Sequence, residues 1–344
     1  MEYRLLGNSG LLVSRLAFGA MTFSSGNRDL SLFNVDPDSA DGLVGQAIDA
    51  GVNFFDTADV YAGGQSEEIL GKALAPHRQN VVIATKVGGR SSQQPLDAGL
   101  TRRHILASVD ASLRRLGTDW IDVYLVHREC SNTPLEETLS TLDAIVRAGK
   151  VRYLGFSNWS AWRVVAAMEM MRANNLVPFT HGQLYYSLVG RDIEDELLPA
   201  LAHYGLGLTV WSPLAGGFLT GKYRRGAQPD EGTRAADFPA MPMDVDRSYA
   251  TLDVMRQVAD THGASLAQIA LAWLLERQPV TSILLGASKS DQLADTLKAV
   301  NVRLSAEQCA ALDAVSAGEP RYPHWFLELF SDQVITGLLA TARN

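Results

Sequence analysis

Four side chains with complementary proton chemistry lie close to short apolar runs of the chain: Asp56, Tyr61, Lys86 and His127. A carbonyl reduction needs a proton donor beside a hydride donor, and a free tyrosine, with a pKa of about 10, is a poor acid at neutral pH. An adjacent Lys86 ammonium favours the phenolate and lowers the pKa of Tyr61. Asp56 can keep that ammonium charged, and His127 can hydrogen-bond the carbonyl oxygen. We therefore expect an acid, the cation that tunes it, a counterion and a donor that orients the substrate.

Each of these residues also has an ordinary explanation. Asp56 can be a turn residue or a helix cap, Lys86 a strand-end surface charge, Tyr61 a packed loop aromatic, and His127 a histidine satisfied in the core. All four explanations would have to hold together, whereas one catalytic site accounts for the whole set. The joint pattern favours the site.

The elements that precede these residues must position them. Short apolar runs alternate with helical patterns, and most of the runs are too apolar to face water on either side, as in buried parallel strands. The predicted strands are Leu16–Phe18, Asn53–Phe55, Val81–Thr85, Ile121–Val126, Val151–Phe156, His181–Leu184, Leu206–Val210 and Ser282–Leu285. The predicted helices are Asp38–Ala50, Ser66–Leu74, Thr101–Leu116, Leu135–Ala148, Ala161–Asn174, Glu194–His203, Leu266–Arg277 and Asp291–Ala299. Several of these helices end at a glycine, as helices often do: Gly51, Gly117, Gly149 and Gly205.

Eight strand–helix units in one chain favour an α/β fold of the (β/α)₈ TIM-barrel type. A doubly wound sheet is the alternative, but the chain has no GxGxxG turn after an early strand. We expect a single domain over residues 1–344: an N-terminal β-hairpin at 3–13, turning at Asn8-Ser9-Gly10, a barrel at 16–300, and a C-terminal helix and tail at 303–344. The helix is expected at Ser305–Ser316. The segment Lys222–Asp246, rich in Pro and Gly, is expected to be a long loop.

The composition excludes several classes of protein. The net charge is −8 with Lys and Arg scattered singly, which argues against a nucleic-acid or anionic-membrane surface. The two cysteines, Cys130 and Cys309, form neither a disulfide framework nor a metal spacing. The chain has no signal-peptide pattern and no apolar run of about 18 residues, so we expect a cytoplasmic protein without a membrane span. We expect no metal site, and the oligomeric state stays open, with a homo-oligomer among the alternatives.

Several segments carry a family resemblance. NFFDTADVYAGGQSEEILGKAL, VVIATKVG, VYLVH, VRYLGFSN, TVWSPLAGGFLTGKY and SILLGASKSDQL resemble the signature segments of the aldo-keto reductase superfamily over about Arg4 to Arg303. The GFSN, WSPLAGG and LLGAS segments are most similar to the branch of bacterial reductases and voltage-gated potassium channel β subunits. The resemblance implies a (β/α)₈ barrel and NADPH-dependent carbonyl reduction. It also implies that Tyr61 is the general acid and that Asp56, Lys86 and His127 complete a tetrad.

The same resemblance implies which residues bind the cofactor. The nicotinamide end would be bound by Gly19, Ala20, Met21 and Asp56, its carboxamide by Ser157, Asn158 and Gln183, and its ring would lie near Trp211. The pyrophosphate would lie along Ser212, Pro213, Leu214, Gly216 and Lys222, with Arg234 as a lid. The adenosine would be surrounded by Gly286, Ser288, Lys289, Gln292 and Asp295. The Gly-Ala-Ser turn opens a helix whose N-terminus can receive a phosphate, and Lys289 adds charge where a 2′-phosphate would lie. Asp295 and Thr296 depart from the Glu-Asn pair common in this branch, which leaves NADH as the alternative cofactor.

Two functions compete on this scaffold. The first is an NADPH-dependent reductase of aldehydes, ketones or sugar carbonyls, and the second is a cofactor-binding regulatory protein with slow chemistry. Competent residues at every tetrad position favour the enzyme. A metal-dependent lyase or isomerase barrel is a remote third alternative, because the other strand ends carry no His/Asp/Glu cluster. Specificity is expected to depend on the loops Phe23–Val35, Gly89–Leu100, Arg128–Thr133 and 224–246 and on the aromatic tail, with Phe23 and Phe33 suggesting an aromatic pocket.

Overall fold

Eight parallel strands close into a barrel in the order β10-β3-β4-β5-β6-β7-β8-β9, which confirms the (β/α)₈ prediction. The computed structural model describes residues 1–26, 32, 34–226, 241–332, 334–335 and 338. The barrel strands are β3 (Leu16–Gly19), β4 (Phe54–Asp56), β5 (Val82–Val87), β6 (Ile121–Val126), β7 (Val151–Ser157), β8 (Phe179–Tyr185), β9 (Gly207–Trp211) and β10 (Val280–Leu285). Each predicted strand overlaps one of these.

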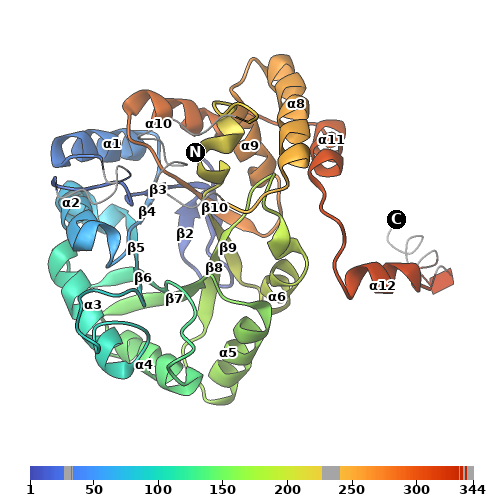
Figure 1. The fold of residues 1–344 in the computed structure, drawn as a ribbon. Coiled ribbons are helices and arrows are strands. Elements are labelled where there is room, and N and C mark those ends of the chain that lie inside the picture. Colours follow the sequence, from blue (N-terminus) through green and yellow to red (C-terminus); the bar gives the residue numbers. More distant parts are fainter. Residues whose placement is uncertain (27–31, 33, 227–240, 333, 336–337, 339–344) are drawn as a thin grey trace.

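Helices surround the barrel on the outside (Figure 1). They are α1 (Pro37–Asp49), α2 (Gln65–Leu74), α3 (Arg102–Leu116), α4 (Leu135–Arg147), α5 (Ala161–Ala173), α6 (Leu197–Tyr204), α8 (Val245–His262), α9 (Leu266–Leu275) and α10 (Ser290–Leu297). The glycines predicted to end helices adopt the left-handed conformation: Gly51, Gly117, Gly149 and Gly205. No helix among the described residues is long and apolar enough to cross a bilayer.

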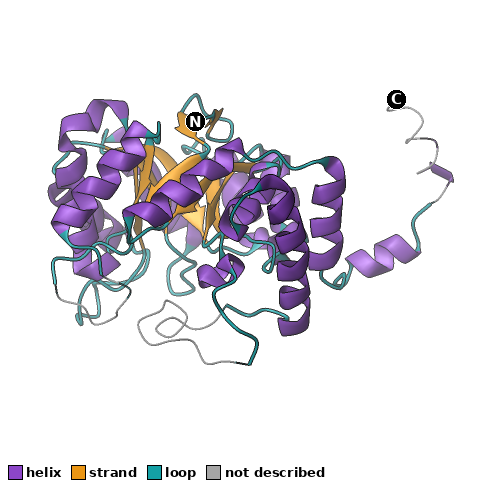
Figure 2. Ribbon diagram, turned by 90° about the horizontal axis from the view of Figure 1, so that it is seen from above, coloured by secondary structure: helices purple, strands orange, loops and turns teal. Residues whose placement is uncertain are grey.

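A short hairpin closes one end of the barrel interior (Figure 2). Its strands β1 (Tyr3–Leu5) and β2 (Leu12–Ser14) pair antiparallel, as predicted. Leu6, which follows β1, and Val13, in the middle of β2, are fully buried and pack against inward-facing strand residues such as Phe54 and Leu125. The barrel interior is therefore a packed core at this end, and a cavity can form only towards the other.

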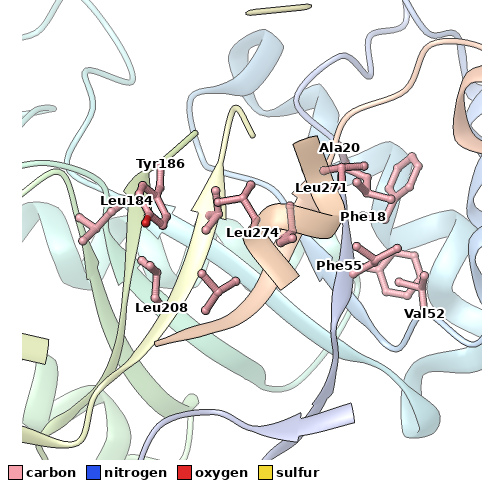
Figure 3. Packing of buried hydrophobic residues seen from close by; sticks show 14 of the residues in the cluster. Phe18, Ala20, Val52, Phe55, Leu184, Tyr186, Leu208, Leu271 and Leu274 are labelled. Atoms are coloured by element: carbon pink, nitrogen blue, oxygen red, sulfur yellow. The ribbon is translucent and has the colours of Figure 1, made fainter. Parts of the chain in front are cut away.

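A second and larger core fills the space between the strands and the helices (Figure 3). Phe18 and Phe55, from neighbouring strands, stack with ring centroids 6.2 Å apart, and Leu271 and Leu274 of α9 are fully buried in the same layer. Phe23, expected in a substrate loop, is also fully buried here, with its ring 5.7 Å from that of Phe18. Apolar strands covered on both faces explain why the strand positions could be predicted.

Two α-helices of the described residues, α8 (Val245–His262) and α12 (His324–Leu329), were not predicted. Most of the predicted loop Lys222–Asp246, residues 227–240, lies outside the described residues, and near its predicted end the Asp244 side chain caps the 18-residue helix α8. Its buried residues recur at helical spacing through Leu252, Met255 and Val258, so the sequence did carry the signal. In the tail, His324–Leu329 forms the short helix α12, which stands away from the barrel in both ribbon views.

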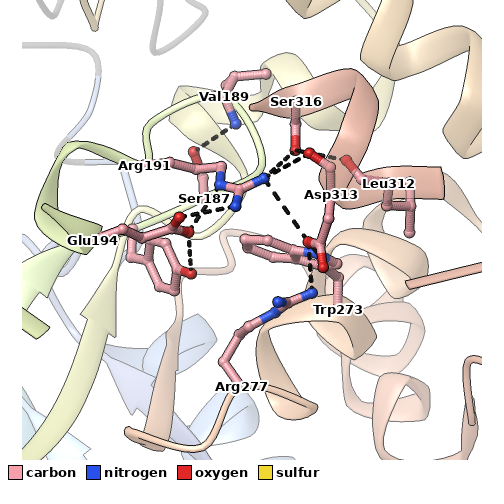
Figure 4. Close-up of polar contacts among 10 residues, drawn as sticks. Ser187, Val189, Arg191, Glu194, Trp273, Arg277, Leu312, Asp313 and Ser316 are labelled. Carbon is pink, nitrogen blue, oxygen red and sulfur yellow. Dashed lines mark hydrogen bonds and ion pairs between the residues drawn. The ribbon is translucent and has the colours of Figure 1, made fainter. Parts of the chain in front are cut away.

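The predicted C-terminal helix is present as α11 (Ala306–Ser316), and a polar network holds it against the barrel (Figure 4). One carboxylate oxygen of Asp313 accepts hydrogen bonds from Trp273 Nε1 at 2.8 Å and from Arg277 at 2.7 Å. Arg191, which follows β8, donates to the Asp313 carbonyl and to the Ser316 hydroxyl. Trp273 lies in α9, Arg277 in the turn directly after it, and Arg191 in the segment after β8, so α11 belongs to the same packed body as the barrel.

Candidate active site

Three of the four proposed catalytic residues lie at the same end of neighbouring strands. Asp56 is the last residue of β4, Lys86 is the penultimate residue of β5, and His127 follows β6 directly, its N–H donating to the Val87 carbonyl at 2.8 Å. Strands β4, β5 and β6 are hydrogen-bonded in parallel register. The structure therefore brings a carboxylate, an ammonium and an imidazole to one rim, as the sequence predicted.

Lys86 and Asp56 form a buried ion pair. Lys86 Nζ lies 2.5 Å from Asp56 Oδ1 and 2.7 Å from the carbonyl of Thr57, and the ammonium is almost fully buried. Burial by itself would lower the pKa of Lys86, but the charges on Asp56 and Tyr61 outweigh it, and the pKa lies above its ordinary value. Burial raises the pKa of Asp56, while Lys86 and Gln183 oppose that effect. Lys86 therefore stays a cation at neutral pH.

Tyr61 reaches this cation from the turn that follows β4. Its hydroxyl lies 3.4 Å from Lys86 Nζ, and the ammonium lies 5.0 Å from the ring centroid. Tyr61 begins the one-turn helix η1 (Tyr61–Gly64), in which Ala62 and Gly63 have left-handed φ angles of 48° and 65°. An alanine rarely adopts that conformation, so the turn holds local backbone strain next to the phenol.

His127 stands against Tyr61 as a neutral imidazole. The two rings meet edge to face with centroids 5.7 Å apart. Burial, with smaller contributions from the charges of Lys86 and Arg128, lowers the pKa of His127 to about 3. A neutral imidazole can donate one N–H to a carbonyl oxygen, so the side chain suits substrate orientation.

Amide and hydroxyl groups lie at the same ends of the neighbouring strands β7 and β8. Gln183 Nε2 donates to Asp56 Oδ2 at 2.7 Å, which gives Asp56 a second partner that the sequence did not predict. Ser157 Oγ donates to the Gln183 carbonyl at 2.7 Å. Asn158 donates to the His127 carbonyl and accepts from Trp211 Nε1 at 3.1 Å. One hydrogen-bonded network thus joins the strand ends from β4 to β9.

These groups face a cavity of about 410 Å³, large enough for a small ligand. Eleven predicted site residues line it: Gly19, Met21, Asp56, Tyr61, His127, Ser157, Asn158, Gln183, Trp211, Ser212 and Gly286. Four lining residues were not predicted individually: Thr22, Leu32, Val60 and Leu284. Val60 precedes Tyr61 and Leu32 lies in a predicted substrate loop, whereas Leu284 lies in strand β10, so no sequence signal pointed to Leu284.

Other predicted cofactor residues lie outside the cavity lining. Ala20 is fully buried, and its N–H donates to the Asp56 carbonyl at 2.8 Å. Pro213 is buried behind the rim, and Leu214 packs partly against the core. A Cβ placed on Gly216, which has a φ of 66°, would meet nothing within 4 Å. Lys222 folds over the adjacent Gly217, where Nζ lies 3.1 Å from an added Cβ. The turn carries a lysine beside backbone that a phosphate could approach.

Four of the five residues predicted to surround an adenosine, all but Asp295, lie in the first turn of α10 or directly before it. Ser288 donates to Gln292 Oε1 at 3.3 Å, and Lys289 is the residue that precedes the helix. Gly286 faces open space. Asp295 is engaged elsewhere, since its carboxylate accepts from Ser265 and Gln268 of the α9 start at 2.7 Å each. Arg234, the predicted lid, lies outside the described residues.

No three histidine, cysteine or acidic side chains gather as metal ligands in the part of the chain that the structure describes. The donor set of the cavity is instead amide, hydroxyl, imidazole and phenol.

Comparison with known proteins identifies relatives over nearly the whole length. The profile of the "Aldo/keto reductase family" matches residues 15–317. The chain is 39% identical over 333 residues to a "Probable voltage-gated potassium channel subunit beta" of Oryza sativa subsp. japonica, covering 93% of this chain and 98% of that protein. A protein with the same description from Arabidopsis thaliana is 39% identical over 88% of this chain and 92% of its own.

A bacterial relative, described as "Uncharacterized oxidoreductase YrpG", comes from Bacillus subtilis (strain 168) and is 34% identical over 92% of this chain and 97% of its own. The barrel, the strand-end residues and these matches lead to one conclusion. The chain belongs to the aldo/keto reductase family.

Proposed function

We propose that the chain is an NADPH-dependent reductase that converts aldehydes, ketones or sugar carbonyls to alcohols. One observation carries the proposal: a phenol and a neutral imidazole line one cavity, and a buried ammonium lies 3.4 Å from the phenol hydroxyl. The Tyr61 hydroxyl donates its proton to the carbonyl oxygen, and the Lys86 cation stabilises the phenolate that remains. Asp56 and the Thr57 carbonyl hold the ammonium in place. His127 donates a hydrogen bond that orients the carbonyl oxygen towards Tyr61.

Bound NADPH would supply the hydride. Ser157, Asn158 and Gln183 would hold the amide end of the cofactor, and Trp211 would lie against its ring. The turn from Ser212 to Lys222 would receive the pyrophosphate, because it carries a lysine. The start of α10 would receive the adenosine phosphate, because a lysine precedes the N-terminus of that helix. Arg234 stays a predicted lid residue. We further propose a small-molecule carbonyl as the partner and a reducing cytosol as the compartment, with no nucleic-acid or membrane surface.

Substitution of Tyr61 by phenylalanine tests the proposal. The Tyr61→Phe variant should lose turnover by a factor of about 10²–10⁴, because general acid catalysis typically contributes that much. The change removes one hydroxyl, so NADPH binding should stay nearly intact. The measurement is the loss of NADPH absorbance with a panel of aldehydes, with binding followed by fluorescence titration. Tyr3→Phe, in the exposed hairpin, is the matched control, and retention of most activity in Tyr61→Phe would remove the proton-donor role.

The names of the plant relatives support a second candidate function: a cofactor-binding subunit of a larger assembly, with slow or vestigial chemistry. The oligomeric state stays open for both functions, with a homo-oligomer among the alternatives. Tight NADPH binding without turnover of any aldehyde in the panel would favour this function over the reductase.

A further inference from the structure

The turn that carries Tyr61 also contains a buried acidic residue, Asp59. Asp59 is only 5% exposed, and neither carboxyl oxygen has a hydrogen bond of normal geometry to any described residue. The charged and titratable groups that face it are Glu67 from α2, Arg115 from α3, Lys86 from β5 and Tyr124 from β6. The Tyr124 hydroxyl is likewise buried without a hydrogen-bond partner among the described residues.

Both cations that face Asp59 are already paired with another carboxylate, Lys86 with Asp56 and Arg115 with Glu67. Glu67 is fully buried, with one oxygen 2.6 Å from Arg115 Nε and the other accepting from the Thr85 hydroxyl at 2.6 Å. Gly64 is required for this approach, since a Cβ there would lie 2.8 Å from the Arg115 side chain. Arg115 is thus committed to Glu67, and a charged Asp59 would add an uncompensated buried charge.

Asp59 therefore favours its neutral form. Burial, followed by repulsion from Glu67, raises the pKa of Asp59 to about 7, although Arg115, Lys86 and the Val60 N–H favour ionisation. His127 cannot supply a transition at this pH, because its pKa lies at about 3.

The backbone of Asp59 connects this cluster to the proton donor. Its N–H donates to the Lys86 carbonyl at 3.2 Å, and two residues earlier the Thr57 carbonyl accepts from Lys86 Nζ at 2.7 Å. Two residues later the Tyr61 N–H donates to the Ala58 carbonyl at 3.2 Å. The turn from Thr57 to Tyr61 is thus fixed to Lys86 on one side and packs the Asp59 carboxyl against Glu67 on the other.

We propose that Asp59 is a positioning residue, whose proton holds the Thr57–Tyr61 turn in the geometry that keeps the Tyr61 hydroxyl beside Lys86. This inference rests on the reductase function proposed above. Loss of the proton places a second carboxylate beside Glu67, and the repulsion displaces the turn. Carbonyl reduction then weakens as the pH rises through neutrality.

The pH dependence of kcat tests this role. In the parent enzyme, kcat should fall about tenfold between pH 6 and pH 8, as the protonated fraction of a group titrating near 7 does. Asp59→Asn cannot ionise at this position, so its kcat should differ by less than about twofold between pH 6 and pH 8. In Glu67→Gln the midpoint should move down by about one unit, because the repelling charge is gone. Glu68→Gln removes an exposed charge from the same helix and should titrate like the parent. An unchanged midpoint in both Asp59→Asn and Glu67→Gln would overturn the proposal.

A second measurement does not depend on activity. A carboxyl group whose pKa is raised in the folded state stabilises the fold at low pH, and that stability is lost as the pH rises through the folded pKa. The urea midpoint of the parent should therefore fall relative to that of Asp59→Asn between pH 5 and pH 7. If Asp59→Asn does not fold, the same comparison with Glu67→Gln decides. Parallel urea profiles for the parent and both variants would show that Asp59 carries no proton near neutrality.

The two proposals fail in different ways. A parent enzyme that reduces no carbonyl removes the reductase function, and the positioning role with it, whatever the urea profiles show. A parent that turns over with an Asp59-independent pH profile removes the positioning role alone.

Discussion

His181 lies in the barrel wall as a buried, neutral imidazole. It is fully buried on β8, its Nε2 has no hydrogen-bond partner among the described residues, and its ring packs within 2.7 Å of where a Cβ on Gly155 would be. Burial lowers the pKa of His181 to about 3. The unfolded chain takes up a proton near pH 6.5 and the folded chain does not, so the stability due to this group falls as the pH drops below that value.

The unfolding free energy of His181→Gln should therefore fall less on acidification than that of the parent. Between pH 7 and pH 5 the parent should lose about 2 kcal/mol of unfolding free energy through this group. The loss accumulates over the roughly 1.5 pH units between the unfolded pKa of about 6.5 and pH 5, at about 1.36 kcal/mol per unit. The variant starts from a lower stability but should lose that much less over the same range. Urea unfolding at both pH values measures the difference, with His203→Gln, an exposed histidine on α6, as the control. Equal losses in the parent and His181→Gln would mean that the buried imidazole is charged in the fold.

At the same scale, the sequence predicted residue types better than their partners. Asp56, Lys86 and His127 could be predicted because apolar strands end at them and parallel strands share a rim. The Gln183–Asp56 hydrogen bond could not, because it joins residues 127 positions apart and depends on the closure of the barrel. The neutral state of His127 depends likewise on burial that only the fold creates.

At the scale of elements, α10 is a helix whose N-terminus carries the proposed adenosine site. Lys289 precedes the helix, and Lys298 stands at its other end. Lys289→Ala should weaken NADPH binding more than NADH binding, because only NADPH has the 2′-phosphate that this cation and the helix N-terminus would meet. The loss for NADPH should be about tenfold, corresponding to a charge-assisted hydrogen bond of about 1.4 kcal/mol.

The measurement is the dissociation constant of each nucleotide by fluorescence titration, with Lys298→Ala as the control on the same helix. A similar loss for both nucleotides would show that Lys289 does not contact the 2′-phosphate. Asp295 is expected to matter differently, since its carboxylate joins α10 to Ser265 and Gln268.

Helices on the outside of the barrel were predicted less completely than strands. The strands are apolar throughout and stand out from their surroundings, whereas α8 follows directly on a segment rich in Pro and Gly, and its apolar residues face only one side. The short α12 has no buried apolar residue to mark it: Trp325, Phe326 and Leu329 are all between 44% and 71% exposed. A helix without a buried face needs no apolar residues at helical spacing, so its sequence does not reveal it.

At the scale of the whole molecule, the C-terminal region divides into a helix that packs on the barrel and a tail that does not. Helix α11 contributes Asp313, which accepts from Trp273 and Arg277 (Figure 4). After it, an ion pair of Arg321 with Asp192, with both side chains at least 65% exposed, ties the base of the tail to the barrel. Exposed ion pairs contribute about 0–1 kcal/mol, so the barrel should not depend on the tail.

A chain that ends at Glu319 should therefore keep its unfolding free energy within about 1 kcal/mol of the parent. Asp313→Ala, which leaves the buried indole N–H of Trp273 without its acceptor, should cost about 1–3 kcal/mol. Asp253→Asn, in an exposed pair on α8, is the control for loss of a surface carboxylate. Urea unfolding measures all four proteins. Should the shortened chain lose as much stability as Asp313→Ala, its aromatic tail must be buried in solution, against its own barrel or a second copy. Sedimentation velocity of the two chain lengths would then distinguish these, because only a contact between copies makes the molecular mass depend on the tail.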